Sequence, residues 1–419
     1  MAEQVKEQVK EQDRWLAQIA KIMTPYSTSP PSFCYPGTIL PDVFGTISKQ
    51  LTPLQINNIG THTYGITSDN SSVQTEGGFD VPHQMEKEYV WWIARMFAKH
   101  DPMNVINLVD GYFCGGGTEG NIEGLWIGRQ WLKETPDHIG LLLSPLTHYS
   151  VVKGAHILEI NKHIKYAKTN EKFEMDINDI KCVLESFLRE GITKIIIVGT
   201  IGTTVCGSID NIKEISYLID TFPKMKIYFH IDASFGGFTA PFVDEQNLYG
   251  FENRNVQSIV VDGDKMGMLP YPSGIFLCRK GLQDNIKIDV PYVGSHMDMT
   301  ISGSRTFVSV ACGWYYINTI GTNGHKQMVA ECIAKRNDLA KKLTNVRGVT
   351  VLPYSEYTNI LPISTPFEVS SQMDPNYNMR YDLVDYHGKS IIIYKLCIFP
   401  HVFNYIDRFV RDLDAATNS

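Results

Sequence analysis

The chain has 419 residues, of which 43% are hydrophobic and 20% charged, and its formal net charge is -7. These proportions are typical of a globular protein and exclude a disordered or fibrous chain, while the lack of a basic block argues against nucleic acid as a partner. The length favours one large and one smaller folding unit.

The residues from Met1 to Asp13 are polar and charged, whereas a secretory signal needs an apolar run. No later stretch reaches the roughly 20 apolar residues of a membrane span. The eight cysteines are scattered singly, without the spacing of a metal site or a disulfide framework. We therefore expect a cytoplasmic protein with no membrane partner, no bound metal and reduced, mostly buried thiols.

Short apolar runs alternate with amphipathic segments from about residue 105 to residue 280. This alternation is typical of a parallel sheet with crossover helices. The expected strands are Ile139 to Leu143, Ile195 to Val198, Ile227 to Ile231, Ser258 to Val261 and Gly274 to Leu277. Helices are expected from Thr118 to Trp131 and after Asp176 and Asp210. Near the C-terminus, a strand from Lys389 to Cys397 and a helix from Val402 to Leu413 indicate a small α/β unit.

The first chemically unusual strand end is the glycine-rich run Gly115 to Asn121, which leads into an expected helix. Glycines let backbone N–H groups approach an anion, and a helix N-terminus adds partial positive charge, so this loop is a candidate phosphate site. Thr118 could cap the helix and contact the phosphate. The glycines also match the dinucleotide pattern, but the next strand ends at Leu143 and Ser144 without an acidic residue. A turn that serves only helix packing is the other alternative.

Three more strand ends carry candidate side chains. His148 follows the run that ends at Leu143, Asp232 directly follows the run that ends at Ile231, and Lys265 follows the run that ends at Val261. Each has an ordinary structural explanation on its own: a core histidine, a turn aspartate and a salt-bridged lysine. Ligands of open α/β sheets bind at the carboxyl ends of the strands, where these residues would meet. Together with the glycine loop, they are the parts needed to hold the phosphate, ring, ring nitrogen and aldehyde of one cofactor.

Several motifs in this order carry a resemblance to a known family: Gly111-Tyr112-Phe113, Gly116 to Asn121, Thr147 to Val151, Gly202-Thr203-Thr204, Gly207 to Asp210, His230-Ile231-Asp232, Asp264-Lys265-Met266 and Thr300 to Arg305. With them the chain resembles the group II pyridoxal-phosphate decarboxylases, most closely the branch of bacterial histidine decarboxylases and plant serine decarboxylases. The cofactor implied is pyridoxal 5'-phosphate. The activity implied is removal of carbon dioxide from an L-amino acid that is histidine-like, aromatic or small and polar.

The resemblance also implies a fold and an assembly. The fold is that of aspartate aminotransferase, fold type I: an α/β protein with a mostly parallel seven-stranded sheet and a smaller C-terminal α/β domain. Residues 1–60 would pack on the large domain and on a partner copy, residues 61–300 would form the large cofactor-binding domain, and residues 301–419 would form the small domain. A homodimer with shared active sites is expected.

Residue roles follow from the same resemblance. Lys265 would bind the cofactor covalently, Asp232 would pair with the ring nitrogen, and His148 would stack on the ring. The remaining positions are Ser234 near Asp232, Gly117 and Thr118 at the phosphate, Thr200 near the ring hydroxyl, and Ser304 and Arg305 at the border of the phosphate or substrate pocket, across the dimer.

One residue departs from the family pattern. The family usually has histidine directly before the lysine, whereas this chain has Asp264. A carboxylate beside a phosphate is repulsive unless a cation such as Arg305 compensates it. A catalytically impaired homologue is therefore an alternative, as is another reaction on the same fold: that of a lyase, a transaminase or an aldehyde-forming deaminase.

Two features of the reaction stay open at this level. The proton that returns to the α-carbon has four candidate donors: Tyr271, Tyr292, His148 and Lys265. The substrate pocket is expected to draw on the N-terminal region, with His62, Tyr64, Trp91 and Trp92 as candidates.

Overall fold

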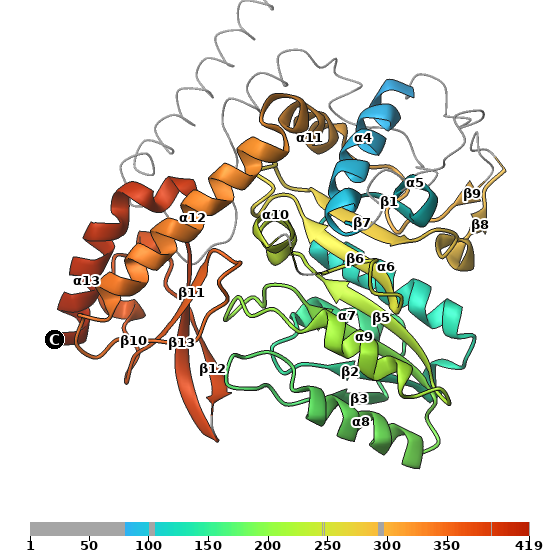
Figure 1. The fold of residues 1–419 in the computed structure, drawn as a ribbon, viewed down its shortest axis with the longest axis horizontal. Helices are drawn as coiled ribbons and strands as arrows, with labels where there is room; N and C mark the ends of the chain where they lie inside the picture. Colours follow the sequence, from blue (N-terminus) through green and yellow to red (C-terminus); the bar gives the residue numbers. More distant parts are fainter. Residues whose placement is uncertain are drawn as a thin grey trace, which may run out of the picture.

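A computed structural model describes residues 80–99, 105–244, 246, 248–291, 297–386 and 388–418, which form a large α/β unit and a smaller one (Figure 1). The expected N-terminal segment 1–60 lies outside these residues, as do His62, Tyr64 and Tyr292.

A seven-stranded sheet forms the centre of the large unit, in the order β1-β7-β6-β5-β4-β2-β3. Only β7 runs antiparallel to its neighbours, so the mostly parallel sheet expected from the sequence is confirmed. All five expected strands are present. The strands are β1 (Val109–Cys114), β2 (Ile139–Leu143), β3 (His163–Tyr166), β4 (Lys194–Thr200), β5 (Lys226–Asp232), β6 (Val256–Asp262) and β7 (Gly274–Arg279).

Helices cover both faces of this sheet because its strands are apolar on both sides. In β4, Ile195 and Ile197 pack into one core, whereas Ile196 and Val198 pack into another on the opposite face. The second core includes α6 (Gly117–Leu132) and α7 (Tyr149–Ile157). The first includes α4 (Asp80–Met96), α5 (Val105–Leu108), α8 (Ile177–Arg189), α9 (Ile212–Asp220), α10 (Ala240–Val243) and α11 (Phe307–Thr319).

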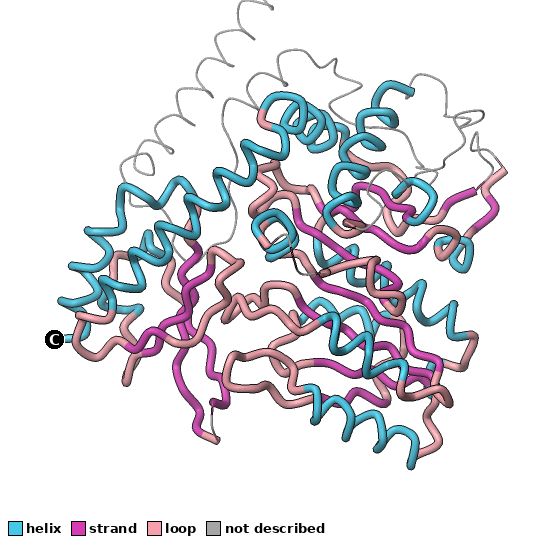
Figure 2. Tube along the Cα trace, viewed as in Figure 1, coloured by secondary structure: helices cyan, strands magenta, loops and turns pink. Residues whose placement is uncertain are grey.

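The smaller unit contains an antiparallel sheet in the order β10-β11-β13-β12 (Figure 2). Its core contains Leu339, Tyr394 and Phe409, all fully buried. The expected helix from Val402 begins only at Ile406, because a 3-10 helix occupies Pro400–Tyr405. The elements are α12 (Gly321–Leu343), β10 (Thr350–Val351), β11 (Ile360–Ser364), β12 (Tyr381–Tyr386), β13 (Lys389–Cys397) and α13 (Ile406–Asn418), beside a two-stranded ribbon of β8 (Ile288–Asp289) and β9 (Met297–Asp298).

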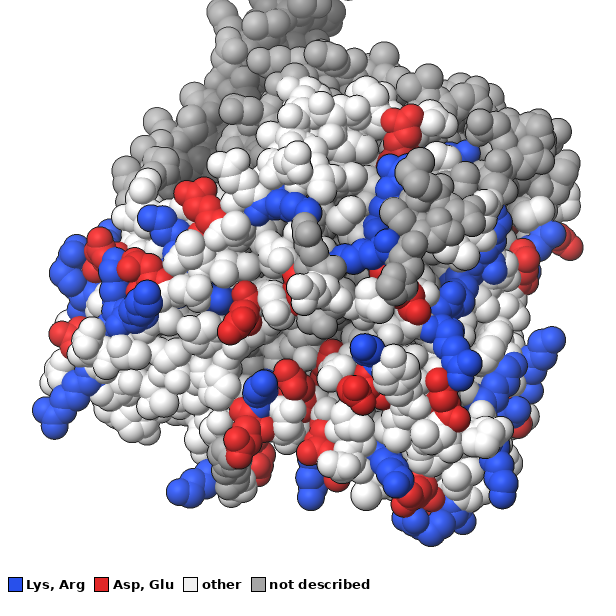
Figure 3. All heavy atoms as spheres, in the orientation of Figure 1, with Lys and Arg blue, Asp and Glu red and all other residues white. Residues whose placement is uncertain are grey.

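The charged surface and the cysteines of the described residues are those of an ordinary globular protein. Described acidic and basic side chains are intermixed on the face in Figure 3. No helix in the described part of the chain combines the length and apolar character needed to cross a membrane. The seven cysteines in that part are free thiols, and all except Cys182 are buried.

Candidate active site

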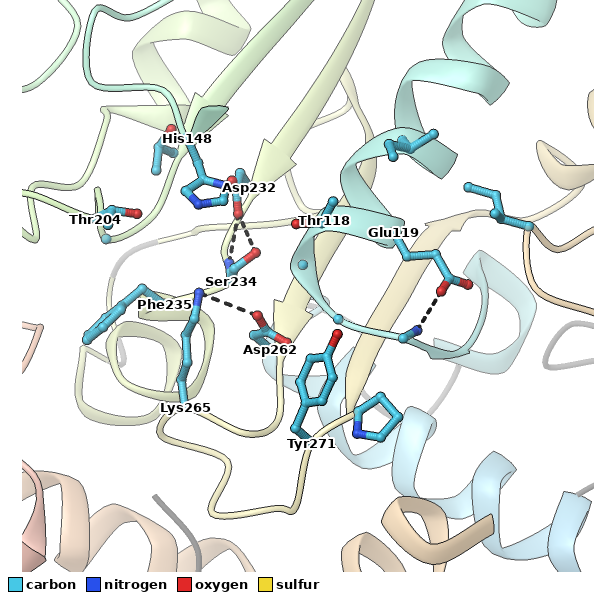
Figure 4. Close-up of a pocket in the computed structure, with 18 residues that line it drawn as sticks. Thr118, Glu119, His148, Thr204, Asp232, Ser234, Phe235, Asp262, Lys265 and Tyr271 are labelled. Atoms are coloured by element: carbon cyan, nitrogen blue, oxygen red, sulfur yellow. Dashed lines mark hydrogen bonds and ion pairs between the residues drawn. The ribbon is translucent and has the colours of Figure 1, made fainter. Parts of the chain in front are cut away.

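The carboxyl ends of the parallel strands border one pocket of about 520 Å³ (Figure 4). Its lining combines the glycine loop after β1, His148 before α7, Thr200 at the end of β4, Asp232 at the end of β5 and Lys265 after β6. Parallel strands bring their carboxyl ends to the same edge of a sheet, which explains why residues more than a hundred positions apart meet here. Such a volume is ordinary for a cofactor or substrate site.

Asp232 lies buried at the wall of this pocket and accepts three hydrogen bonds. Its Oδ1 accepts from the backbone N–H of Ser234 at 3.0 Å and from the Ser234 hydroxyl at 2.6 Å, and its Oδ2 accepts from Asn121 Nδ2 at 2.9 Å. Burial alone would raise the pKa of Asp232. The hydrogen bonds from Ser234 and Asn121 and the charge of Lys265 outweigh burial and hold this pKa below its usual value. Asp232 is therefore ionised at neutral pH.

Asn121 and His230 form a second layer behind Asp232, and the sequence analysis assigned neither of them a role. His230 Nε2 lies 2.9 Å from Asn121 Oδ1, and its Nδ1 lies 2.7 Å from Ser258 Oγ. Burial lowers the pKa of His230 to about 4, so the ring is neutral and donates a single N–H. Since Asn121 Nδ2 donates to Asp232, this layer fixes the direction of the carboxylate. The only sequence signal was the presence of Asn121 and His230 within the quoted motifs.

His148 is the N-cap residue of α7, and its ring borders the pocket beside Asp232 (Figure 4). Its Nδ1 lies 2.8 Å from Ser150 Oγ, and Ser150 in turn accepts from Asn121 Nδ2 at 3.0 Å. Burial lowers the pKa of His148 more than the Asp232 charge raises it. A neutral imidazole held in this way can stack on a flat ring.

Lys265 reaches the pocket from the turn after β6, with 17% of its side chain exposed. Its Nζ lies 3.4 Å from Asp262 Oδ2 and 5.8 Å from the centre of the Phe235 ring. Burial does favour the neutral form, but the charges of Asp262, Asp232 and Asp264 outweigh it and raise the pKa of Lys265.

The glycine loop turns directly into α6, whose N-cap is Gly116 with a φ of 136°. The expectation that Thr118 caps this helix is wrong, because Thr118 lies inside the first turn, where it borders the pocket. A Cβ on Gly117 would lie 2.3 Å from Ser234 Oγ, so a larger residue there cannot pack without displacing Ser234. The loop itself is held by Glu119 Oε2, which accepts from the backbone N–H of Gly115 at 3.0 Å.

Thr200 ends β4 with its hydroxyl buried and without a hydrogen-bond partner among the described residues. Its backbone N–H donates to Asp210 Oδ2 at 2.7 Å. A buried hydroxyl without a partner is costly unless a ligand satisfies it. Thr200 thus brings an unpartnered hydroxyl to the wall of the pocket, and Asp210 holds its backbone.

Ser304 and Arg305 do not line this pocket in the single chain. They border a neighbouring cavity of about 150 Å³ together with Phe113 and Pro272. The Arg305 guanidinium is buried against Glu86, forms an ion pair with it and donates to the carbonyl of Phe113 at 2.8 Å. Arg305 therefore already has an acidic partner, and that partner is not Asp264.

The two tryptophans expected near the substrate lie elsewhere. Trp92 is buried among Phe242 and His325, and its indole N–H donates to Thr322 Oγ1 at 2.8 Å. Trp91 is partly buried against the same core and is absent from the described pocket lining. Tyr271, by contrast, borders the pocket and is 74% exposed.

Pyridoxal 5'-phosphate fits this arrangement of residues. An ionised Asp232 suits a protonated ring nitrogen, the neutral His148 suits the ring face, and the unpartnered Thr200 hydroxyl suits the ring hydroxyl. The start of α6 suits a phosphate. Lys265 supplies the amine that the aldehyde requires.

Comparison with known proteins agrees with this chemistry. Residues 81–360 match the family description "Pyridoxal-dependent decarboxylase conserved domain". A tryptophan decarboxylase of Clostridium sporogenes is 28% identical over 368 residues, which cover 85% of this chain and 82% of the relative. A probable L-aspartate decarboxylase of Archaeoglobus fulgidus is 28% identical over 305 residues, covering 72% of this chain and 78% of the relative.

Solved structures share the fold at lower sequence identity. A glutamate decarboxylase of Lactobacillus brevis superposes with a TM-score of 0.77 at 16% identity, covering 97% of this chain and 92% of that one. A sphingosine-1-phosphate lyase of Burkholderia pseudomallei gives a TM-score of 0.74 at 15% identity, covering 98% and 90%. These likenesses support the expected aspartate-aminotransferase type of fold. Because the family match spans more than half of the chain, the protein belongs to the pyridoxal-dependent decarboxylase family and uses pyridoxal 5'-phosphate.

Proposed function

We propose that this amino acid decarboxylase acts on a substrate with an uncharged side chain, histidine-like, aromatic or small and polar. One observation carries the proposal. Among the described residues that line the pocket, Lys265 is the only lysine or arginine, whereas Glu119, Asp232 and Asp262 are carboxylates. The side-chain carboxylate of aspartate or glutamate would meet repulsion in such a pocket. The named relatives include both tryptophan and aspartate decarboxylases. The negative charge of this lining favours an uncharged substrate such as tryptophan over aspartate.

The residue roles are part of the same proposal. The bound cofactor supplies an electron sink for the pair of electrons left at the α-carbon when carbon dioxide departs. Lys265 holds the cofactor, Asp232 keeps a proton on the ring nitrogen, and His148 packs on the ring. Thr200 bonds the ring hydroxyl.

The phosphate end and the proton donor complete these roles. Gly117 and Thr118 bind the phosphate through the start of α6, and Ser234 orients Asp232. Tyr271 is the candidate donor of the proton that returns to the α-carbon, with His148 and Lys265 as alternatives, since all three border the pocket. Ser304 and Arg305 border the site only if a second copy completes it.

The assembly and location are proposed in the same way. We infer a cytoplasmic homodimer, in which residues 1–60 pack on the partner, residues 61–300 bind the cofactor and residues 301–419 form the small domain. Support for the dimer comes from Tyr271 and Ile301, which border the pocket and are 74% and 42% exposed, respectively. In a dimer these two side chains would be covered by the partner copy.

The experiment is a screen of the common amino acids for carbon dioxide release with added cofactor, with products identified by mass spectrometry. We expect kcat/KM for the best uncharged substrate to exceed those for aspartate and glutamate by about tenfold or more. Lys265→Ala, prepared alongside, corrects for reaction of the free cofactor. Fastest turnover of an acidic substrate would contradict the substrate proposal alone. An aldehyde or keto acid in place of the amine would instead indicate a lyase, transaminase or deaminase reaction.

A further inference from the structure

Asn121 lies in the first turns of α6, and its side chain is fully buried behind the pocket. Its Nδ2 lies 2.9 Å from Asp232 Oδ2 and 3.0 Å from Ser150 Oγ. Its Oδ1 lies 2.9 Å from His230 Nε2. An amide nitrogen carries two hydrogens and an amide oxygen only accepts, so the orientation of this one amide gives a direction to all three hydrogen bonds.

Asp232 fixes the orientation of the amide. Its carboxylate is ionised and can only accept a hydrogen bond. In the opposite orientation Asn121 would turn its own acceptor oxygen toward Asp232 Oδ2, and two buried acceptors would meet without a hydrogen between them. The nitrogen of Asn121 therefore faces Asp232, and its second hydrogen goes to Ser150.

The amide oxygen in turn fixes the hydrogen of His230. Because Asn121 Oδ1 only accepts, the neutral His230 ring must carry its hydrogen on Nε2, which leaves Nδ1 as an acceptor. Ser258 Oγ lies 2.7 Å from that Nδ1 and accepts from the Tyr228 hydroxyl at 2.9 Å. Every hydrogen bond from Tyr228 to Asp232 thus runs in the same direction, and each donor has one acceptor.

The same amide acts on His148 through Ser150. Since Ser150 Oγ accepts from Asn121, its own hydroxyl hydrogen can point at His148 Nδ1, which lies 2.8 Å away. The backbone N–H of Ser150 points at the same ring nitrogen from 3.4 Å. A ring nitrogen that faces two donors is an acceptor, so a neutral His148 carries its hydrogen on Nε2. The ring borders the pocket with its other edge turned away from Ser150 (Figure 4).

The charged groups around His148 leave its ring neutral. Burial lowers the pKa of His148, and the charges of Asp232 and Asp262 do not offset this effect. The charges of Lys265 and Lys395 lower the pKa further. A single hydrogen is therefore shared between the two ring nitrogens, and the hydrogen bonds decide which of them holds it.

We propose that Asn121 is a positioning residue that sets the tautomer of His148, so that this ring offers an N–H donor at Nε2 to the pocket and does not transfer a proton. A neutral imidazole is a very weak acid, so His148 is not the donor of the proton that returns to the α-carbon. Tyr271 and Lys265 remain as candidates. This exclusion rests on the decarboxylation proposed above, whereas the tautomer does not depend on the substrate.

The test is nitrogen NMR of the cofactor-loaded, full-length chain with labelled histidine rings at neutral pH. Ring nitrogens with and without hydrogen differ widely in chemical shift, and the signals of His148 are identified by their loss in His148→Gln. His325 is an internal reference, because its Nε2 lies 2.8 Å from the carbonyl oxygen of Phe238, which only accepts. We expect His148 to show the same pattern as His325, with hydrogen on Nε2 alone. Hydrogen on Nδ1, or on both nitrogens, would overturn the proposal.

Two variants test the part played by Asn121. In Asn121→Asp the new side chain accepts from Ser150 in place of donating to it, so hydrogen should appear on His148 Nδ1. The same exchange at the exposed Asn178 should leave the His148 signals unchanged. Ser150→Ala, which removes the hydroxyl between Asn121 and His148, should shift these signals to values between the two tautomers.

If the signals of His148 were the same in Asn121→Asp and Ser150→Ala as in the wild type, Asn121 would have no influence on the ring. Should Asn121→Asp not fold, Ser150→Ala and the wild type still decide the outcome. Failure of the carbon dioxide screen would remove the proposed substrate, but it would leave the histidine signals as expected here.

Discussion

Lys265 combines two properties that conflict in a free lysine, a buried position and a raised pKa. Three carboxyl groups, Asp262, Asp232 and Asp264, keep its amine protonated. A protonated amine is a poor nucleophile, so the Lys265 amine must be neutral when it attacks the aldehyde of the cofactor. Lys265 must therefore lose a proton before it can react with the aldehyde of the cofactor.

Borohydride treatment of the enzyme loaded with pyridoxal 5'-phosphate should fix the cofactor on the peptide that contains Lys265. Lys265→Ala should remain unlabelled, because no other lysine of the described chain borders the pocket. Lys395→Ala is the matched control, since the charge of Lys395 reaches His148 yet its side chain is not part of the lining. Peptide mass mapping gives the answer. Label on any other lysine would remove Lys265 from its proposed role.

At the scale of single elements, α6 connects the cofactor end of the pocket to the sheet. Its N-terminus forms the glycine loop, and Asn121 in its first turns holds Asp232. Glycines let this helix approach the strands closely. A Cβ on Gly120 would lie 2.3 Å from Val260 Cγ2, and one on Gly124 would lie 2.5 Å from His230 Nδ1. Glycine at these two positions therefore lets the helix lie close enough to the sheet for Asn121 to reach Asp232.

Gly124→Ala tests this close approach. The added methyl group must displace the His230 ring or the helix, and overpacking of a core typically costs about 1–3 kcal/mol of unfolding free energy. Urea denaturation measures that loss, and cofactor affinity should fall with it because His230 supports Asn121. Gln130→Ala, an exposed position of the same helix, should leave stability within about 0.5 kcal/mol of the wild type. Equal stabilities for the two variants would mean that the helix shifts without cost.

At the scale of the whole molecule, the ion pair of Glu86 and Arg305 connects distant parts of the chain. Glu86 belongs to α4 and also accepts from the backbone N–H of Phe113 in β1 at 2.8 Å. Arg305 lies just before α11 and donates to the carbonyl of Phe113. Both side chains of the ion pair are almost fully buried. This cluster ties three segments together next to the glycine loop, so damage to it should affect stability first.

Glu86→Gln should destabilise the protein by roughly 3–5 kcal/mol, because it leaves the Arg305 charge buried without its partner. Replacing both residues by apolar ones, Glu86→Leu with Arg305→Met, should cost less than the sum of the two single replacements. Urea denaturation of the four proteins forms a double-mutant cycle. Additive costs would show that the two charges are solvated and do not depend on each other.

The sequence by itself determined the strands, the parallel sheet and the positions of the strand-end residues. Short apolar runs predict buried strands from local pattern alone, and parallel strands place their carboxyl ends on one edge. That rule was enough to bring the glycine loop, His148, Asp232 and Lys265 to one pocket, as the structure does. The roles of these residues remain predictions that the experiments above address.

The tertiary structure alone decided which side chains face one another. Asp232 accepts a hydrogen bond from Asn121, which is 111 residues away in the sequence. Arg305 pairs with Glu86, which is 219 residues away. Local pattern also misplaced the N-cap of α6, which is Gly116 and not Thr118. Hydrogen bonding and charge act across the packed interior, so their partners are set by how helices lie on the sheet. Periodicity encodes which face of an element is buried, but not which polar group of another element it meets there.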